Sequence, residues 1–272
     1  MSYYYLKASL PEIQLGAEPG LFDFKSVFSL IETNLKPEDR KVYEAIILQN
    51  DNRNFLNILF NEYFELEYEN EHRPSYLHIE WLEDYRRHMG ELPDYMLAFL
   101  KEHSGFFSTY TLTEIELRLR AYFMDYIKSL DSMFLLYYYD WQYQLKELLS
   151  EINVGQFPFL KPRGIYDVDY LRPVKAINIQ LDKQKIQTDL LPLLTVEDYT
   201  GLERQIDEYY WEFAESWPDD FSAYSIWAYV VKLLRIARWA MLFDGEHQDK
   251  AAFESLLQGL KDNNSEPKMT VI

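Results

Sequence analysis

Cysteine is absent from this chain of 272 residues, and glycine and valine are scarce, with 9 of each. The absence of cysteine excludes disulfides, thiolate metal sites and cysteine nucleophiles. Leucine, by contrast, occurs 38 times. Because leucine suits helices and β-branched valine suits strands, this ratio favours helices throughout. We therefore expect an all-α protein made of packed helical units, with little or no sheet.

Long apolar runs are also missing. The nearest candidate, residues 226–243, is interrupted by Lys232, Arg235 and Arg238, so we expect no transmembrane segment. The first residues, Met1 to Lys7, have neither the basic flank nor the apolar stretch of a signal peptide. The sequence therefore predicts a cytoplasmic protein.

Basic residues are outnumbered by acidic ones, 27 Lys and Arg against 45 Asp and Glu, which gives a net charge of −18. Phosphate groups are bound by Lys and Arg, so this balance argues against nonspecific binding of nucleic acid or anionic lipid. Aromatic residues, by contrast, make up 17% of the chain. Tyr and Trp join a large apolar body to a polar tip, so they suit both a thick core and an interface.

Helix start and stop signals divide the chain. Asp23 and Asp51 are expected N-caps, Pro37 is an expected first residue, and Thr111 with Glu114 forms a capping box. The expected helices cover about 23–35, 37–48, 51–59, 76–89, 94–103, 111–152 with a break near 129–132, 197–216, 222–243 and 247–261. Breaker residues then predict an N-terminal helical region (1–152), a connector (153–173) and a C-terminal helical region (174–272), which can pack as one domain.

The basic part of the connector, residues 161–175, is the proposed partner-binding segment. It begins the one net-basic stretch of the chain and contributes Lys161, Arg163 and Arg172. Phe159 and Tyr166 supply apolar anchors beside these charges. The alternative is that the three cations fold back onto acidic helices and pair there.

Residues that could carry chemistry have simpler explanations. Asp84 and His88 are spaced for a metal site on a helix, with His72, His78 and Glu80 nearby. Neighbouring Arg73, Arg86 and Arg87 would repel a cation, so a solvated helix face is favoured. Runs of acids lack the asymmetry that acid–base catalysis needs, and no Gly-rich phosphate loop or Gly-x-Ser-x-Gly motif occurs. We expect no catalytic site, metal or cofactor.

Two further patterns are expected to be internal. Lys232, Arg235 and Arg238 form a basic stripe that we expect to pair with acids of the preceding helix. The aromatic string Phe134, Tyr137, Tyr138, Tyr139, Trp141 and Tyr143 points in several directions on a helix, so most of it is expected to be core.

Four segments in order resemble a known family. They are Tyr3-Tyr4-Tyr5-Leu6-Lys7-Ala8-Ser9-Leu10-Pro11-Glu12, then Asp51-Asn52-Arg53-Asn54-Phe55-Leu56, then Leu92-Pro93-Asp94-Tyr95, and last the stretch from Trp227 to Trp239. Together they resemble a bacterial family long labelled as of unknown function. Its members are encoded among V-type ATPase subunits, where they stand in for the C-type (eukaryotic d) subunit.

The resemblance implies a noncatalytic part of a proton- or sodium-transporting rotary ATPase or ATP synthase. C-type subunits are helical, funnel-shaped central-stalk proteins that join the shaft to the membrane rotor ring. The resemblance thus implies other V-type ATPase subunits as partners and a peripheral position at the inner membrane. The alternatives are a generic helical adaptor and, third, a metal-dependent enzyme using the Asp84 and His88 region.

Overall fold

The computed structural model describes residues 3–16, 23–66, 71–156 and 181–244, which form ten α-helices and no strand. The all-α prediction is therefore confirmed for this part of the chain. No helix among these residues is long and apolar enough to cross a membrane. The helices are α1 (Tyr4–Ser9), α2 (Phe24–Asn34), α3 (Pro37–Phe64), α4 (Ile79–Glu83), α5 (Asp94–His103), α6 (Leu112–Ser129), α7 (Met133–Gln156), α8 (Lys183–Thr195), α9 (Tyr199–Glu215) and α10 (Ala223–Asp244).

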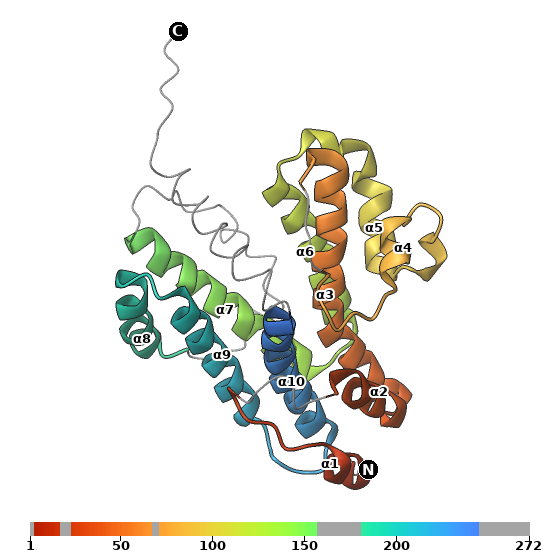
Figure 1. Cartoon of the computed structure of the whole chain (residues 1–272). Coiled ribbons are helices and arrows are strands. Elements are labelled where there is room, and N and C mark those ends of the chain that lie inside the picture. The colour runs from red at the N-terminus through yellow and green to blue at the C-terminus, as the bar shows by residue number, and fades with distance from the viewer. Residues whose placement is uncertain (1–2, 17–22, 67–70, 157–180, 245–272) are drawn as a thin grey trace.

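The helices form two groups joined by α3 and α10 (Figure 1). On one side α5 packs against α6, and α4 packs against α3. On the other side α8 packs against both α7 and α9, and α9 packs against α10. The long helix α3 contacts α6, α7 and α10, so it belongs to both groups. Helices α1 and α2 close one end of the molecule (Figure 1).

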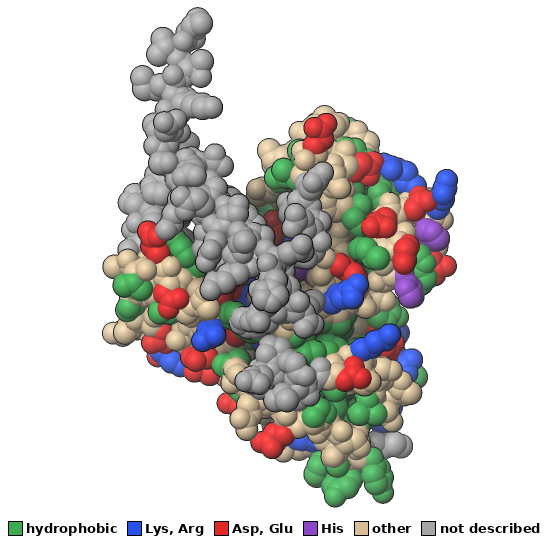
Figure 2. Space-filling view, viewed as in Figure 1, with side chains coloured by type: hydrophobic (Ala, Val, Ile, Leu, Met, Phe, Trp, Pro, Cys, Tyr) green, Lys and Arg blue, Asp and Glu red, His purple; other side chains and the backbone are tan. Residues whose placement is uncertain are grey.

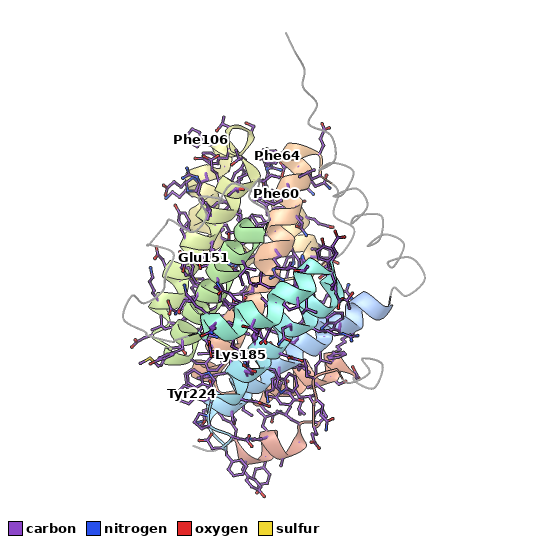
Figure 3. The ribbon with its side chains drawn as sticks, turned by 90° about the vertical axis from the view of Figure 1, so that its left-hand side faces the viewer. Phe60, Phe64, Phe106, Glu151, Lys185 and Tyr224 are labelled. Carbon is purple, nitrogen blue, oxygen red and sulfur yellow. The ribbon has the colours of Figure 1, made fainter. Side chains whose placement is uncertain are left out.

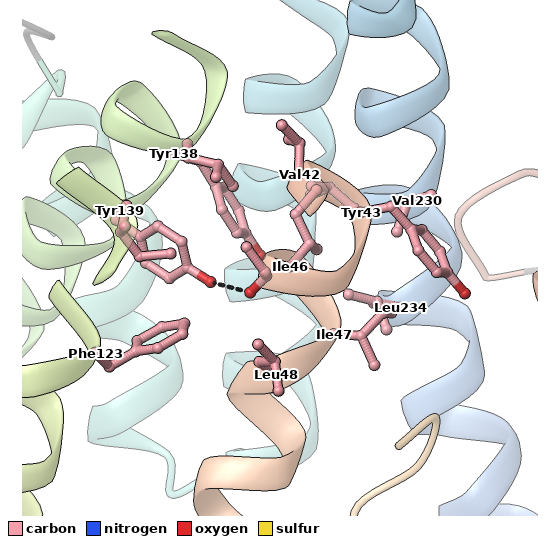
Figure 4. Close-up of a cluster of buried hydrophobic side chains, with 14 of the residues drawn as sticks. Val42, Tyr43, Ile46, Ile47, Leu48, Phe123, Tyr138, Tyr139, Val230 and Leu234 are labelled. Atoms are coloured by element: carbon pink, nitrogen blue, oxygen red, sulfur yellow. Dashed lines mark hydrogen bonds between the residues drawn. The ribbon is translucent and has the colours of Figure 1, made fainter. Parts of the chain in front are cut away.

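A cluster of buried hydrophobic side chains lies where α3 meets α7 and α10 (Figure 4). Ile46 and Ile47 of α3, Tyr138 of α7 and Val230 of α10 are almost wholly buried there. The hydroxyl of Tyr139 donates to the carbonyl oxygen of Ala45 at 2.8 Å, which fixes α7 against α3. Truncating one such aliphatic side chain to Ala typically costs about 2–5 kcal/mol. This contact therefore holds the two groups together.

Several predicted helix ends are confirmed. The Asp23 side chain accepts a hydrogen bond from the Ser26 backbone N–H, so it caps α2. Thr111 and Glu114 form the expected capping box at the start of α6. The helix break expected near 129–132 is also confirmed, because α6 ends at Ser129 and α7 begins at Met133.

The prediction of a helix start at Asp51 is wrong. Helix α3 runs without interruption from Pro37 to Phe64, and Asp51 lies inside it, fully buried. Its carboxylate instead accepts from the backbone N–H groups of Tyr76 and Leu77, both at 3.0 Å, and from the Ser75 hydroxyl at 2.7 Å. Aspartate is a common helix cap, but this aspartate anchors a distant loop instead.

The helix predicted over 76–89 is also largely wrong. Only Ile79–Glu83 is α-helical, and a short 3-10 turn covers Met89–Glu91. The start of the predicted segment is held as a loop by α3, since Asp51 takes the N–H groups of Tyr76 and Leu77. The helix predicted at 247–261 lies outside the described residues.

The predicted connector is mostly outside the described residues. Helix α7 runs on to Gln156, into the stretch expected to be non-helical from 153. The remainder of the connector, 157–173, is not described. The division into two regions and a connector stays a prediction.

Candidate docking surface

The residues that the sequence indicates for partner binding cannot be placed. Phe159, Lys161, Arg163, Tyr166 and Arg172 all lie outside the described residues. Their role in binding stays a prediction. The other patterns in the sequence lie within the described residues and have clear environments.

The basic stripe on α10 pairs with acids of α9, as expected. Lys232 forms an ion pair with Glu215 at 3.0 Å. Arg238 binds both Glu203, at 2.6 Å, and Asp207, at 2.7 Å. The stripe is therefore used to join two helices of the same chain.

The aromatic string on α7 is mostly core, also as expected. Phe134, Tyr138, Tyr139, Trp141 and Tyr143 are buried, while Tyr137 is half-buried. Trp141 packs against the ring of Phe213 on α9, with 4.8 Å between ring centroids. These rings fix α7 to α9 and are not available to a partner.

Two residues of the metal hypothesis, Asp84 and His78, have other contacts. Asp84 pairs with Arg87 at 3.1 Å, and the His78 ring packs on Trp81 with centroids 4.5 Å apart. Burial, and then the charge of Arg53, lower the pKa of His72 to about 4. Within residues 3–16, 23–66, 71–156 and 181–244, no group of three or more His, Asp or Glu side chains is placed to hold a metal ion.

A cluster of exposed aromatic side chains stands at the end of the molecule closed by α1. Tyr5 is 85% exposed, Tyr4 54%, Phe221 43% and Tyr224 37%. We call these four residues the aromatic tip. In the space-filling view, hydrophobic side chains gather at this end (Figure 2). Aromatic side chains are enriched in the buried centres of protein interfaces, so such a cluster on a surface indicates a docking site.

Backbone and charged contacts hold the aromatic tip in place. The Tyr3 backbone N–H donates to the carbonyl oxygen of Phe221 at 2.6 Å, which ties α1 to the connection between α9 and α10. Lys7 pairs with Asp219 and donates to the carbonyl oxygen of Asp220 at 2.7 Å. These contacts join segments more than 200 positions apart in the sequence.

Tyr3 anchors the same helix on its inner side. Its hydroxyl donates to Asp39 of α3 and accepts from the Lys36 backbone N–H at 3.1 Å. Burial, and then this bond to Asp39, raise the pKa of Tyr3 to about 12. The neutral hydroxyl therefore stays a donor at physiological pH, with Tyr4 and Tyr5 facing outward from the anchored helix.

Ring contacts order the exposed side chains further. Tyr4 packs on Phe221 with 4.8 Å between centroids. Tyr224 stacks on Trp217 at 5.2 Å, with only 9° between the ring planes. Fixed rings lose little conformational entropy when a partner binds, which favours tight docking.

Sequence reasoning missed this surface. The run Tyr3-Tyr4-Tyr5 carried part of the family resemblance, but nothing linked it to Phe221 and Tyr224. The available signal was the three adjacent tyrosines, since a short helix can bury only one side of such a run. Here Tyr3 is buried and the next two are exposed.

The fold and surface define an all-α protein with an exposed aromatic surface and paired internal charges. The chain belongs to the family described as "Protein of unknown function (DUF2764)", which it matches over residues 1–264. No curated protein and no solved structure matches the chain significantly.

Proposed function

We propose that this protein is a noncatalytic subunit of a V-type rotary ATPase or ATP synthase that couples the central shaft to the membrane rotor ring. The resemblance of the four sequence segments to proteins encoded among the subunits of such ATPases suggests the complex. The observation that carries the role is the aromatic tip on an all-helical body. Transmitting torque requires a stiff body with docking surfaces and no chemistry of its own.

The stiffness follows from the way the helices are joined. Helix α3 contacts helices of both groups, and its buried face packs on α7 and α10. Ion pairs between α9 and α10 add to this packing. A close-packed interior deforms little, so a load applied at one end is passed to the other.

The charges around the aromatic tip suggest the chemistry of its partner. Asp219 and Asp220 are exposed beside Phe221. Lys7 pairs with Asp219, so these three residues keep one net negative charge, and the chain as a whole carries a net charge of −18. An apolar patch with an acidic rim fits a protein surface with an apolar centre and Lys or Arg around it. We propose that this surface belongs to one of the two rotor partners, the shaft or the ring, which would hold the protein at the cytoplasmic face of the membrane.

A reconstitution experiment tests the coupling role. Rotary ATPase depleted of this subunit is placed in lipid vesicles, and ATP-driven ion pumping and ATP hydrolysis are both measured. Adding the purified chain should restore the number of ions pumped per ATP hydrolysed. If depleted vesicles already pump at the full ratio, the coupling role is excluded.

A matched pair of variants tests the surface. For the double variant Tyr5→Ser and Phe221→Ser, the protein concentration needed to restore pumping should rise at least tenfold, because two exposed aromatic anchors are removed. Phe106→Ser is the control, since Phe106 is 54% exposed and lies at the end opposite Tyr224 (Figure 3). Equal loss in both variants, or in neither, would show that the aromatic tip is not the docking site.

A further inference from the structure

The aromatic tip continues along the side of the molecule into a row of apolar side chains. Tyr224 of the aromatic tip stacks on Trp217, whose ring centroid lies 6.0 Å from that of Tyr137 on α7. Met133 lies one helical turn before Tyr137 and is 53% exposed, while Tyr137 and Trp217 are half-buried. We call Met133, Tyr137, Trp217 and Tyr224 the lateral row.

A buried ring supports the lateral row from beneath. Phe134 of α7 is fully buried, and its centroid lies 4.7 Å from that of Trp217 and 5.5 Å from that of Trp227 on α10. These contacts tie α7 to α10 and to the connection between α9 and α10. The row is therefore part of the close-packed interior on one side, and it keeps its shape when a partner binds.

Neighbouring members of the lateral row are spaced like the turns of an α-helix. The ring centroids of Tyr224 and Trp217 are 5.2 Å apart, and those of Trp217 and Tyr137 are 6.0 Å apart. Met133 and Tyr137 are four residues apart on α7, which corresponds to about 6 Å along the helix. The pitch of an α-helix is about 5.4 Å. Apolar side chains from successive turns of a partner helix can therefore contact successive members of the row.

A partner strand fits this surface less well than a helix. A strand binds by adding to the free edge of a sheet. Residues 3–16, 23–66, 71–156 and 181–244 form no strand, so they offer no such edge. The surface therefore favours a helix as the docking element.

Unpaired acids flank both ends of the lateral row. Asp131 lies two residues before Met133, and Asp220 lies four residues before Tyr224. Both aspartates are exposed, and neither makes an ion pair within the described part of the chain. The row therefore has negative charge at each end.

The bases nearest to these acids in the sequence or the structure are already paired. Lys128 pairs with Asp125 at 3.0 Å, and Lys7 pairs with Asp219. Neither lysine is therefore left to neutralise Asp131 or Asp220. A partner that carries Lys or Arg beside its apolar face complements this surface.

We propose that the aromatic tip and the lateral row form one continuous docking track for an amphipathic helix of the partner. The apolar side chains of that helix lie along the row, and its Lys or Arg side chains face Asp131 and Asp220. Amphipathic helices bind apolar surfaces in this way, through anchors spaced by three or four residues. The inference rests on the proposed docking role of the aromatic tip and names the kind of structure that docks there.

Photo-crosslinking in the assembled complex tests the docking track. Benzoylphenylalanine replaces Met133 in one variant and Tyr5 in another, and the rotary ATPase that contains each variant is isolated through a tag on a catalytic subunit and irradiated. Position 133 should link to a rotor subunit, at a helical segment with an apolar face and Lys or Arg beside it. The control replaces Met89, which is 45% exposed on the 3-10 turn Met89–Glu91, and should not link to that segment.

The crosslinks separate this inference from the coupling role. A link to a rotor subunit from position 5 but not from position 133 would overturn the continuous track and leave the coupling role standing. A link from position 133 to a segment that is acidic or not helical would overturn the track as well. Links from neither position to any subunit of the rotary ATPase would contradict both the track and the coupling role.

A matched pair of variants tests the charge of the partner helix. Asp131→Asn removes one charge and keeps the left-handed backbone, because Asn tolerates a φ of 47° as Asp does. Its association with rotary ATPase depleted of this subunit should be several-fold slower at low ionic strength and depend less on salt. Glu83→Gln, at another exposed position on α4, should associate at the normal rate. Equal rates for the two variants would exclude a basic partner helix.

Discussion

The buried carboxylate of Asp207 on α9 accepts a hydrogen bond from Nη2 of Arg238 on α10 at 2.7 Å. The same oxygen accepts from the Trp239 indole nitrogen at 2.6 Å, and the other oxygen lies 3.8 Å from Arg235. Asp207 is fully buried, so these partners offset the cost of removing its carboxylate from water. This residue is the electrostatic centre of the contact between α9 and α10.

Asp207→Ala should therefore lower the free energy of unfolding by about 3–5 kcal/mol, the usual cost of removing one partner of a buried ion pair. Urea denaturation measures it. Glu212→Ala, at an exposed position that pairs with Lys185, is the matched control and should cost about 1 kcal/mol or less. A loss at Asp207 no larger than at Glu212 would contradict this account of the helix pair.

Asp51→Ala should release the loop that it anchors on α3. Three donors, the Tyr76 and Leu77 N–H groups and the Ser75 hydroxyl, lose their acceptor. We expect a destabilisation of about 1–3 kcal/mol or more, together with faster amide hydrogen exchange at Tyr76 and Leu77. Asn57→Ala on the same helix is the control, since Asn57 makes no side-chain hydrogen bond among the described residues. Unchanged exchange at Leu77 would show that the anchor is not formed.

Lys146 should make stability depend on pH between about 7 and 10. Burial, and then the neighbouring Arg120 and Arg53, lower its pKa to about 7 in the folded protein, with Glu116 opposing and Arg235 adding to the shift. The pKa of an unfolded lysine is about 10.4. Between these values the unfolded chain binds the proton more readily, so the lowered pKa of Lys146 destabilises the folded protein, by an amount that is greatest below about pH 7 and disappears above about pH 10.4.

The wild type should consequently gain stability relative to Lys146→Gln when pH is raised from 7 to 9.5. Urea denaturation of both proteins at the two pH values, in a phosphate-free buffer, gives the difference. Lys101→Gln on α5 serves as the control, because the Lys101 side chain is exposed. A difference between wild type and Lys146→Gln that stays constant with pH would place the pKa of Lys146 at its ordinary value.

The helices could be predicted where their start signals act locally. Asp23 and the Thr111 and Glu114 pair satisfy backbone N–H groups within their own first turn, so a short sequence window contains all the information needed. Asp51 shows the limit of this reasoning. A carboxylate satisfies donors of a distant loop as well as those of a helix end, and only the tertiary structure decides which.

The same distinction between local and distant contacts applies to the surfaces. The pairing of Lys232 and Arg238 with α9 was predictable, because neighbouring helices in the sequence often pack together and α9 is rich in acids. The aromatic tip depends on the contact between Tyr3 and Phe221, which lie far apart in the chain. This juxtaposition leaves no local pattern in the sequence.

The composition of the purified complex tests the proposed role most directly. The rotary ATPase is isolated from the source cells through a tag on a catalytic subunit, and its subunits are quantified by mass spectrometry. The account predicts this chain in a fixed ratio to the shaft subunits, with the ratio reduced at least tenfold for the Tyr5→Ser and Phe221→Ser variant and unchanged for Phe106→Ser. An assembly that contains every shaft and ring subunit but not this chain would contradict the account.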